Sequence, residues 1–288
     1  KIIADFWKVI SAAVLAGVII ILTVVLILKT ITHPLRVSFL DVGQGDAILI
    51  QTPHGHTMLV DGGASDRILE KIAVKKNFFD RRIDVVFATH PDADHVTGLI
   101  PVLSKYNVGI IVTAPVRGET GIFSEFTKRV TAENANVRTG ARGDAIIFGD
   151  GVVAHILYPS AQFRGSKKET NDASVSMVIT YGDMSVLLTG DLSLKYEGEL
   201  LQEVLPHKVT IYKAGHHGSN SSSGEQLLSY IQPEYAIISA GKNNKYDHPG
   251  TEATQRLATY SKEILSTIEK GTITFSLTEN TIRIATDK

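Results

Sequence analysis

Residues 89–95 read THPDADH, and this stretch decides the fold that we expect. It holds four side chains that can bind a metal ion, those of His90, Asp92, Asp94 and His95. The apolar run at 83–88 predicts a buried strand before it, and residues 96–105 predict a helix after it. The imidazoles and carboxylates therefore share a loop between a strand and a helix. Such a mixed His/Asp set suits zinc, manganese or iron.

The composition limits the class of protein. The chain has 288 residues, a formal net charge of -1 and no cysteine. Its near-neutral balance argues against a strongly basic surface of the kind that binds nucleic acid without specificity. The absence of cysteine excludes thiolate metal sites and any disulfide partner.

The N-terminal segment is strongly apolar. Residues 9–28 carry no charge, and only Ser11, Gly17 and Thr23 interrupt the apolar run. About 20 such residues span the hydrocarbon core of a bilayer. A cleaved signal peptide is the alternative, but no small-x-small pattern follows the run. We therefore expect a transmembrane anchor over residues 1–32, with a span at about 9–28, and one further domain over 33–288. The balance of positive charges on the two sides leaves the orientation open.

Strand and helix signals are interspersed along the rest of the chain. Apolar runs predict further strands at 35–40, 47–52, 57–60, 108–112, 145–148, 152–157, 175–181, 185–188, 209–212 and 235–239, with a closing hairpin at 271–276 and 281–285. Helices are predicted at 65–76, 123–135, 194–205, 225–231 and 251–259. This order favours an α/β protein with two sheets covered by helices over a single winding of βαβ units.

Two further clusters of potential ligands also follow predicted strands. Residues 189–191 read TGD and place the carboxylate of Asp191 after the strand at 185–188. Residues 213–219 read KAGHHGS, in which His216 and His217 are flanked by glycines. Neighbouring side chains at a strand end diverge, so we expect one histidine to bind metal and the other to support it or contact substrate.

Two polar loops are candidates for supporting roles. Residues 243–249 read NNKYDHP, and His248 could donate a proton to a leaving group, or it could be an ordinary loop histidine. Residues 171–174 read NDAS and could orient metal ligands, or they could form a simple Asx turn.

Together these clusters resemble the motifs of the metallo-β-lactamase superfamily. The matching stretches are DVGQGD at 41–46, VDGG at 60–63, HPDADH at 90–95, NDAS at 171–174, TGD at 189–191, KAGHHGS at 213–219 and NKYDHP at 244–249. Asp92 stands where the superfamily commonly has histidine. This departure is typical of the hydrolase domain of the DNA-uptake channel ComEC and its stand-alone relatives. The resemblance covers about residues 35–285.

The resemblance implies a four-layer αβ/βα sandwich that holds one or two divalent ions, zinc or manganese. His90 and Asp92 look like ligands of one metal, and Asp94 and His95 look like ligands of the second. Asp191 would bridge them, and His216 or His217 would complete the site. Asn171, where many members have histidine, implies either incomplete occupancy of the first metal position or a harder ion such as manganese. The other motif residues that would contact substrate or support the ligands are Asp46, Asp61, Asn171, Ser174, Lys213, Ser219 and Asn244.

The implied activity is that of a membrane-anchored, metal-dependent hydrolase, foremost a phosphodiesterase or nuclease. Its substrate would be DNA, its partner the channel or other competence machinery of DNA uptake, and its location outside the cytoplasm. Asp94 or Asp92 would orient the nucleophile, and His248 would protonate the leaving oxygen. The alternatives are a hydrolase of another small ester, such as a lipid, phosphocholine or lactone, and a catalytically silent metal-binding module. Asp92 disfavours a β-lactamase.

Overall fold

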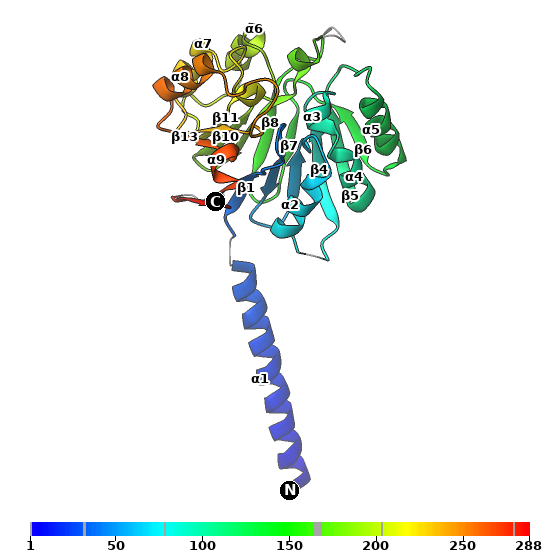
Figure 1. Ribbon diagram of the computed structural model, residues 1–288. Coiled ribbons are helices and arrows are strands. Elements are labelled where there is room, and N and C mark those ends of the chain that lie inside the picture. The colour runs from blue at the N-terminus through cyan, green and yellow to red at the C-terminus, as the bar shows by residue number, and fades with distance from the viewer. Residues whose placement is uncertain (1, 31–32, 78, 164–168, 203, 279) are drawn as a thin grey trace. The chain divides into compact units, whose positions relative to one another are not determined.

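The computed structural model describes residues 2–30, 33–77, 79–163, 169–202, 204–278 and 280–288, and in its first helix the side chains at 7 and 10–23 (Figure 1). The chain divides into two compact units, Lys1–His33 and Pro34–Lys288. The first unit contains the helix α1 (Ile2–Thr30). The second contains both sheets and the other helices.

The expected membrane span is contradicted. None of the helices formed by the described residues combines the length and apolarity needed to cross a membrane. The prediction of single-pass membrane localisation is therefore wrong.

The first sheet has the strand order β15-β14-β1-β2-β3-β4-β5-β6. Its strands are β1 (Leu35–Phe39), β2 (Ile48–Gln51), β3 (Thr57–Val60), β4 (Arg82–Ala88), β5 (Asn107–Thr113), β6 (Asn136–Thr139), β14 (Ile273–Leu277) and β15 (Ile282–Thr286). Neighbours from β15 to β3 pair antiparallel, and those from β3 to β6 pair parallel. The parallel strands are joined by helices α2 (Arg67–Lys75), α3 (Ala93–Val96), α4 (Leu99–Lys105) and α5 (Gly121–Ala132).

The second sheet has the order β13-β12-β11-β10-β9-β8-β7. Its strands are β7 (Ala145–Ile147), β8 (Val153–Tyr158), β9 (Ser176–Tyr181), β10 (Met184–Leu188), β11 (Ile211–Lys213), β12 (Tyr235–Ile238) and β13 (Glu263–Ser266). Strands β10 to β13 pair parallel. The connecting helices are η1 (Thr170–Ala173), α6 (Leu194–Glu197), η2 (Gly198–Gln202), η3 (Gly215–Gly218), α7 (Glu225–Ile231), α8 (Thr251–Tyr260) and α9 (Thr267–Lys270).

Three apolar cores set the order of the layers. One core lies between the two sheets, with Phe39 from the first and Met177 from the second. Another packs the first sheet against its helices, with Ile68 of α2 and Phe126 of α5. The third packs the second sheet against its helices, with Leu257 of α8. Within the second unit the layers therefore run helix, sheet, sheet, helix (Figure 1), and the predicted two-sheet αβ/βα architecture is confirmed.

Two glycines allow backbone segments to pack closely around residues 89–98, which include the predicted ligands at 90–95. A Cβ on Gly45, where φ is +112°, would lie 2.0 Å from the backbone oxygen of Asp94. A Cβ on Gly98 would lie 1.9 Å from the backbone oxygen of Gly62. This contact accounts for a difference from our prediction of one continuous helix at 96–105. The chain instead forms α3 and α4, which are separated where Gly98 lies against Gly62.

Candidate metal centre

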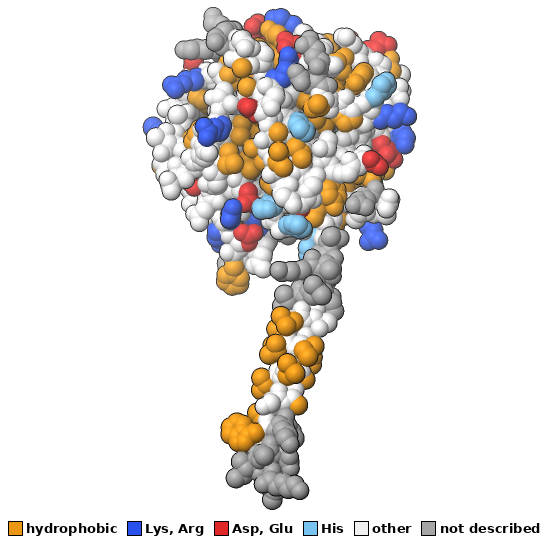
Figure 2. Space-filling view, turned by 180° about the vertical axis from the view of Figure 1, so that it is seen from behind, with side chains coloured by type: hydrophobic (Ala, Val, Ile, Leu, Met, Phe, Trp, Pro, Cys, Tyr) orange, Lys and Arg blue, Asp and Glu red, His pale blue; other side chains and the backbone are white. Residues whose placement is uncertain are grey.

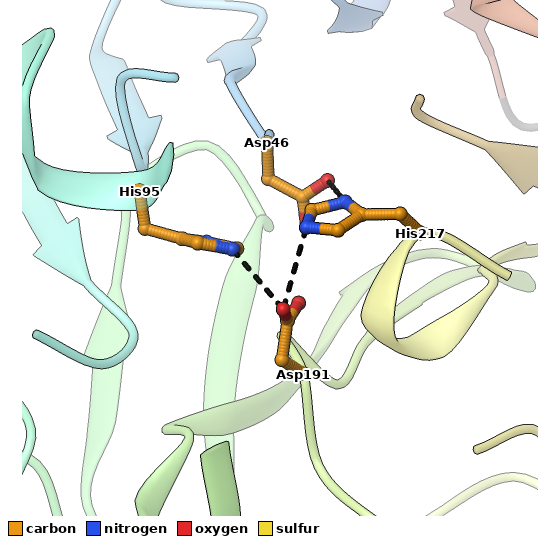
Figure 3. Close-up of side chains that lie close together, drawn as sticks. All are labelled: Asp46, His95, Asp191 and His217. Carbon is orange, nitrogen blue, oxygen red and sulfur yellow. Dashed lines mark ion pairs between the residues drawn. The ribbon is translucent and has the colours of Figure 1, made fainter. Parts of the chain in front are cut away.

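A cluster of ionisable side chains lies where strands of both sheets end. Asp46, His95, Asp191 and His217 are all buried, and each offers a ligand atom within 4.8 Å of the others. His95 belongs to α3, which follows β4 of the first sheet, whereas Asp191 and His217 follow β10 and β11 of the second. Figure 3 shows the two imidazoles approaching the Asp191 carboxylate from different sides. Each Nε2 lies 3.3 Å from Asp191 Oδ2.

The other predicted ligands surround the same carboxylate. The Nε2 atoms of His90 and His216 lie 3.9 and 3.6 Å from Asp191 Oδ2. His90 Nε2 is also 3.9 Å from Asp92 Oδ2. Asp94 Oδ2 lies 3.4 Å from Nε2 of His217. The structure thus brings together all of the side chains that the sequence predicted as ligands.

The donor set fits a divalent cation. Nε2 of His90, His95 and His217, and Oδ1 of Asp191, are buried and have no hydrogen-bond partner among the described residues. A buried polar atom left unpaired costs about 1–3 kcal/mol. Imidazole nitrogen and carboxylate oxygen are ligands of zinc and manganese, so a bound ion would satisfy these atoms.

Asp61 contacts Nδ1 of His95, the ring nitrogen that does not face Asp191. Its Oδ2 lies 2.7 Å from His95 Nδ1, and the carboxylate also accepts hydrogen bonds from the backbone N and the Oγ1 of Thr89 at 2.8 and 2.7 Å. A proton on His95 Nδ1 leaves Nε2 free to bind a metal.

His217 is oriented in the same way. Its Nδ1 lies 3.0 Å from the carbonyl oxygen of Ser239, which can only accept, so Nδ1 carries the proton. The same nitrogen lies 3.2 Å from Asp46 Oδ1. Asp46 in turn forms a buried ion pair with Lys213. Lys213 therefore neutralises a carboxylate that would otherwise be buried beside the cluster without a cation.

The pKa values reflect this concentration of charge. Burial alone would lower the pKa of His95, but the carboxylates of Asp191 and Asp61 outweigh it and raise that pKa well above its usual value. The pKa of His217 is raised in the same way by Asp191 and Asp46, against burial. Despite its burial, Asp191 has a pKa well below the usual range because His217 and His95 lie beside it. The surrounding carboxylates thus favour the protonated rings of His95 and His217. A bound metal cation could balance the same negative charge in place of those protons.

The sequence did not show which of His216 and His217 is the metal ligand, and in the structure their side chains differ in burial. His217 is buried, whereas the side chain of His216 is 27% exposed. Both residues have a left-handed backbone, with φ of 46° and 56°. This backbone lets both rings reach Asp191, where extended residues would point their side chains apart.

Several predicted supporting residues have identifiable contacts. Ser174 Oγ accepts a hydrogen bond of 3.1 Å from the backbone N of Asp191. Asn171 Oδ1 is buried and has no hydrogen-bond partner among the described residues. Ser219 instead bonds to Ser221 within its own loop. Asn244 bonds to the backbone of its loop, including the N and O of His248.

His248 lies at the rim of the cluster, with its ring centroid 5.2 Å from that of His216. Burial, together with the charges of His216 and His217, lowers the pKa of His248 to about 4. The ring is therefore neutral at pH 7. It can donate a hydrogen bond in that state, but it holds no extra proton to transfer.

Three contacts were missed by the sequence reasoning. Thr170 Oγ1 donates to Asp92 Oδ1 at 2.5 Å, Thr89 donates to Asp61, and the carbonyl of Ser239 accepts from His217. Thr170 and Thr89 directly precede motif residues, which is the signal that could have drawn attention to them. A backbone carbonyl such as that of Ser239 leaves no signal in residue type.

The sequence profile of the metallo-beta-lactamase superfamily matches residues 40–242. The chain belongs to this superfamily. Its fold and the four-residue cluster indicate a metal-dependent hydrolase.

The curated relatives include ComE operon protein 3 of Bacillus subtilis, which is 31% identical over 83% of this chain and 33% of its own length. Recombination protein 2 of Haemophilus influenzae is 30% identical over 93% of this chain and 32% of its own length. Competence protein ComA of Neisseria gonorrhoeae is 31% identical over 84% and 32%. The predicted resemblance to ComEC-like competence proteins is confirmed. The chain spans about a third of the length of these relatives.

Solved structures share the fold. The metallo-beta-lactamase fold protein YhfI from Bacillus subtilis has a TM-score of 0.54 and 12% identity, over 83% of this chain and 98% of that protein. The E377D mutant of CmlA beta-hydroxylase has a TM-score of 0.54 and 14% identity, over 84% of this chain and 54% of that protein. At these identities the likeness concerns the fold alone.

Proposed function

We propose that this chain is a metal-dependent phosphodiesterase that cleaves DNA, with zinc or manganese as its ion and competence machinery as its partner. The observation that carries the proposal is the position of Asp191. Its carboxylate lies within 3.3–3.9 Å of Nε2 atoms from both sheets. A carboxylate placed in this way can bridge two cations, and paired cations suit a phosphodiester, whose oxygens can contact both.

The ligand residues divide into two groups around Asp191. His90 and Asp92 would hold one ion, while His95, Asp94 and His217 would hold the other. Bound divalent cations supply Lewis-acid polarisation of the phosphate and activate water. The remaining roles belong to the protein. Asp94 orients the nucleophile, and neutral His248 donates a hydrogen bond to the leaving oxygen.

The relatives favour DNA as the substrate. One is named a competence protein and another a recombination protein. The carboxylate Asp92, which takes the place of a common histidine, disfavours β-lactam hydrolysis.

The test is cleavage of single-stranded and double-stranded DNA, and of bis-p-nitrophenyl phosphate, by the whole chain with manganese or zinc. We expect metal-dependent cleavage that falls at least about 100-fold in Asp191→Asn and His95→Ala, because each loses a ligand or a ligand's partner. The control is Asp183→Asn, which removes an exposed carboxylate at the other end of β10 and should leave the rate unchanged. Equal rates in Asp191→Asn and the wild type would overturn the assignment of the site.

One observation favours a second candidate, hydrolysis of a small apolar ester. A cavity of about 610 Å³ borders His90 and is lined by apolar side chains that include Val116, Phe123, Phe126 and Val130. An acyl group would fit such a lining. Faster turnover of p-nitrophenyl acyl esters or lactones than of any phosphodiester would favour this second candidate over the first.

A further inference from the structure

An exposed aromatic side chain lies two residues from His248, at the edge of the metal centre. The side chain of Tyr246 is 51% exposed. Its ring stacks on that of His248, with centroids 5.6 Å apart and planes 23° apart. His248 in turn contacts His216, whose Nε2 is 3.6 Å from Asp191. A series of rings therefore leads from the candidate metal centre to the surface.

The loop that carries Tyr246 is held in place by Asn244. Oδ1 of Asn244 accepts hydrogen bonds from the backbone N of Tyr246 and of His248, at 3.1 and 3.0 Å. Its Nδ2 donates to the carbonyls of Gly241 and His248, at 3.0 and 2.6 Å. The exposed ring is thus positioned before any ligand arrives, which reduces the entropy lost on binding.

The surroundings of Tyr246 suit a nucleotide. A hollow of about 340 Å³ lies beside it and His248, and its lining includes the polar residues Ser219, Asn220 and Thr251 and the acidic Asp247. The ammonium of Lys245 lies 4.8 Å from the centroid of the Tyr246 ring. A cation–π contact at an exposed site is weaker than stacking of a base on an aromatic ring. An arriving base can therefore displace the ammonium, which then pairs with a neighbouring phosphate.

The net charge of the chain does not indicate a general attraction for nucleic acid. The chain has a formal net charge of -1. On the face shown in Figure 2, the coloured lysine and arginine side chains lie singly or in small groups and do not form a continuous basic track. Proteins that bind single strands combine a positively charged groove with aromatic rings on which bases stack. Tyr246 and Lys245 supply such a ring and a positive charge next to each other.

We propose that Tyr246 stacks against a base of single-stranded nucleic acid next to the bond that the metal centre cleaves, while Lys245 pairs with an adjacent phosphate. This inference rests on the proposed phosphodiesterase function and names the form of its substrate. Bases within a duplex already stack on one another, so an exposed platform of this kind selects single strands.

The first experiment compares a single-stranded oligonucleotide with a matched strand of abasic residues, using the whole chain and manganese. We expect Tyr246→Ala to lower kcat/KM on the normal strand about 5–100-fold, mainly through KM, and to leave the abasic strand unchanged. Tyr246→Phe and Tyr246→Trp keep an aromatic face and should keep the rate. Equal losses on both strands, or no loss on either, would overturn the inference.

The proposed phosphate contact of Lys245 is tested through the salt dependence of binding to the normal strand. Lys245→Ala should lower the slope of log affinity against log salt concentration by about 0.7, the value for one phosphate contact on a single strand. Lys208→Ala is the matched control. Lys208 is exposed and precedes the first residue of β11, whereas the candidate ligand His217 follows the last residue of that strand. An unchanged slope in Lys245→Ala would overturn the assigned phosphate contact.

A binding readout separates this inference from the proposed function. The chain has one tryptophan, Trp7, so the double variant Trp7→Phe, Tyr246→Trp reports fluorescence from position 246 alone. Stacking with oligothymidylate should quench it, whereas the abasic strand should not. If the wild type cleaved neither strand, the proposed function would fail. Quenching would then still support base stacking, and its absence would overturn the inference.

Discussion

Asp61 is a buried carboxylate whose position depends on its own backbone as well as on its partners. Its φ is 59°, a left-handed conformation that aspartate and asparagine adopt more readily than most residues. From there it accepts hydrogen bonds from the N and Oγ1 of Thr89 and holds Nδ1 of His95. Because His95 Nε2 points at Asp191, Asp61 sets the direction of a candidate metal ligand.

Substitution of Asp61 by asparagine should weaken metal binding and spare the fold. Asparagine keeps the shape and the left-handed backbone, but its amide nitrogen cannot accept a hydrogen bond. We expect the metal affinity of Asp61→Asn to fall about 10–100-fold, measured by competition with a chromophoric chelator. Asp66→Asn is the control, because Asp66 is exposed and its side chain makes no capping hydrogen bond. The same affinity in both variants would exclude the orienting role.

Residue type and placement after strands marked out candidate ligands, and the superfamily resemblance predicted that they share one site. The sequence did not resolve how His216 and His217 share it, because this depends on two left-handed residues in succession. It also did not show that His248 would be neutral, since the pKa of His248 depends on neighbours from distant segments. Tyr246 was overlooked because an aromatic residue in a polar loop has no distinctive spacing.

At the scale of elements, prediction succeeded where burial imposes a pattern. The central strands β2, β3 and β4 have mostly buried side chains and were predicted within a residue or so. Strand β6 was missed because all its side chains are exposed, so its sequence carries no apolar alternation. Strand β13 was also missed, and it too lies at the edge of a sheet. Its pairing with β12 is a long-range contact that local sequence does not report.

Glu197 joins two elements, and its loss should destabilise the fold. Its carboxylate accepts hydrogen bonds from the backbone N of Ser223 and Gly224, at 2.6 and 2.7 Å, at the start of α7. We expect Glu197→Ala to lower the free energy of unfolding by about 2–4 kcal/mol, since two backbone donors lose their acceptor. Glu197→Gln keeps one acceptor and should lose less. Urea unfolding measures both, with the exposed Glu252→Gln as a control that should match the wild type.

The pH dependence of the same variants checks the environment of Glu197. Burial raises the pKa of this carboxyl above its usual value, against the two backbone hydrogen bonds. As pH rises, the carboxyl of Glu197 therefore loses its proton at a higher pH in the native state than in the unfolded state, where its pKa is about 4.3. The stability of the wild type relative to Glu197→Gln should thus be highest below that pH and decline as pH rises through the raised pKa. An increase over this range would contradict the assigned direction.

At the scale of the whole fold, the candidate centre connects two sheets that otherwise meet through their apolar core. His95 follows β4 of the first sheet, while Asp191 and His217 follow β10 and β11 of the second. The resemblance to the metallo-β-lactamase superfamily implied this convergence, because it placed Asp191 and one of the two histidines beside the ligands at 90–95. A cation held by ligands from both sheets would stabilise their packing as well as support catalysis.

Metal binding should therefore raise the melting temperature of the protein. A ligand present at 100 times its Kd stabilises the native state by about 2.7 kcal/mol. In a domain of this size that corresponds to a rise of about 5–10 °C. We expect this rise on addition of manganese or zinc to chelator-treated protein, its reversal by chelator, and its loss in Asp191→Asn, while Asp183→Asn behaves as the wild type. The reason is that Nε2 of His90, His95 and His217, which is buried without a hydrogen-bond partner among the described residues, would bind the ion. A melting temperature that did not respond to any divalent ion would show that these buried nitrogens are not metal ligands.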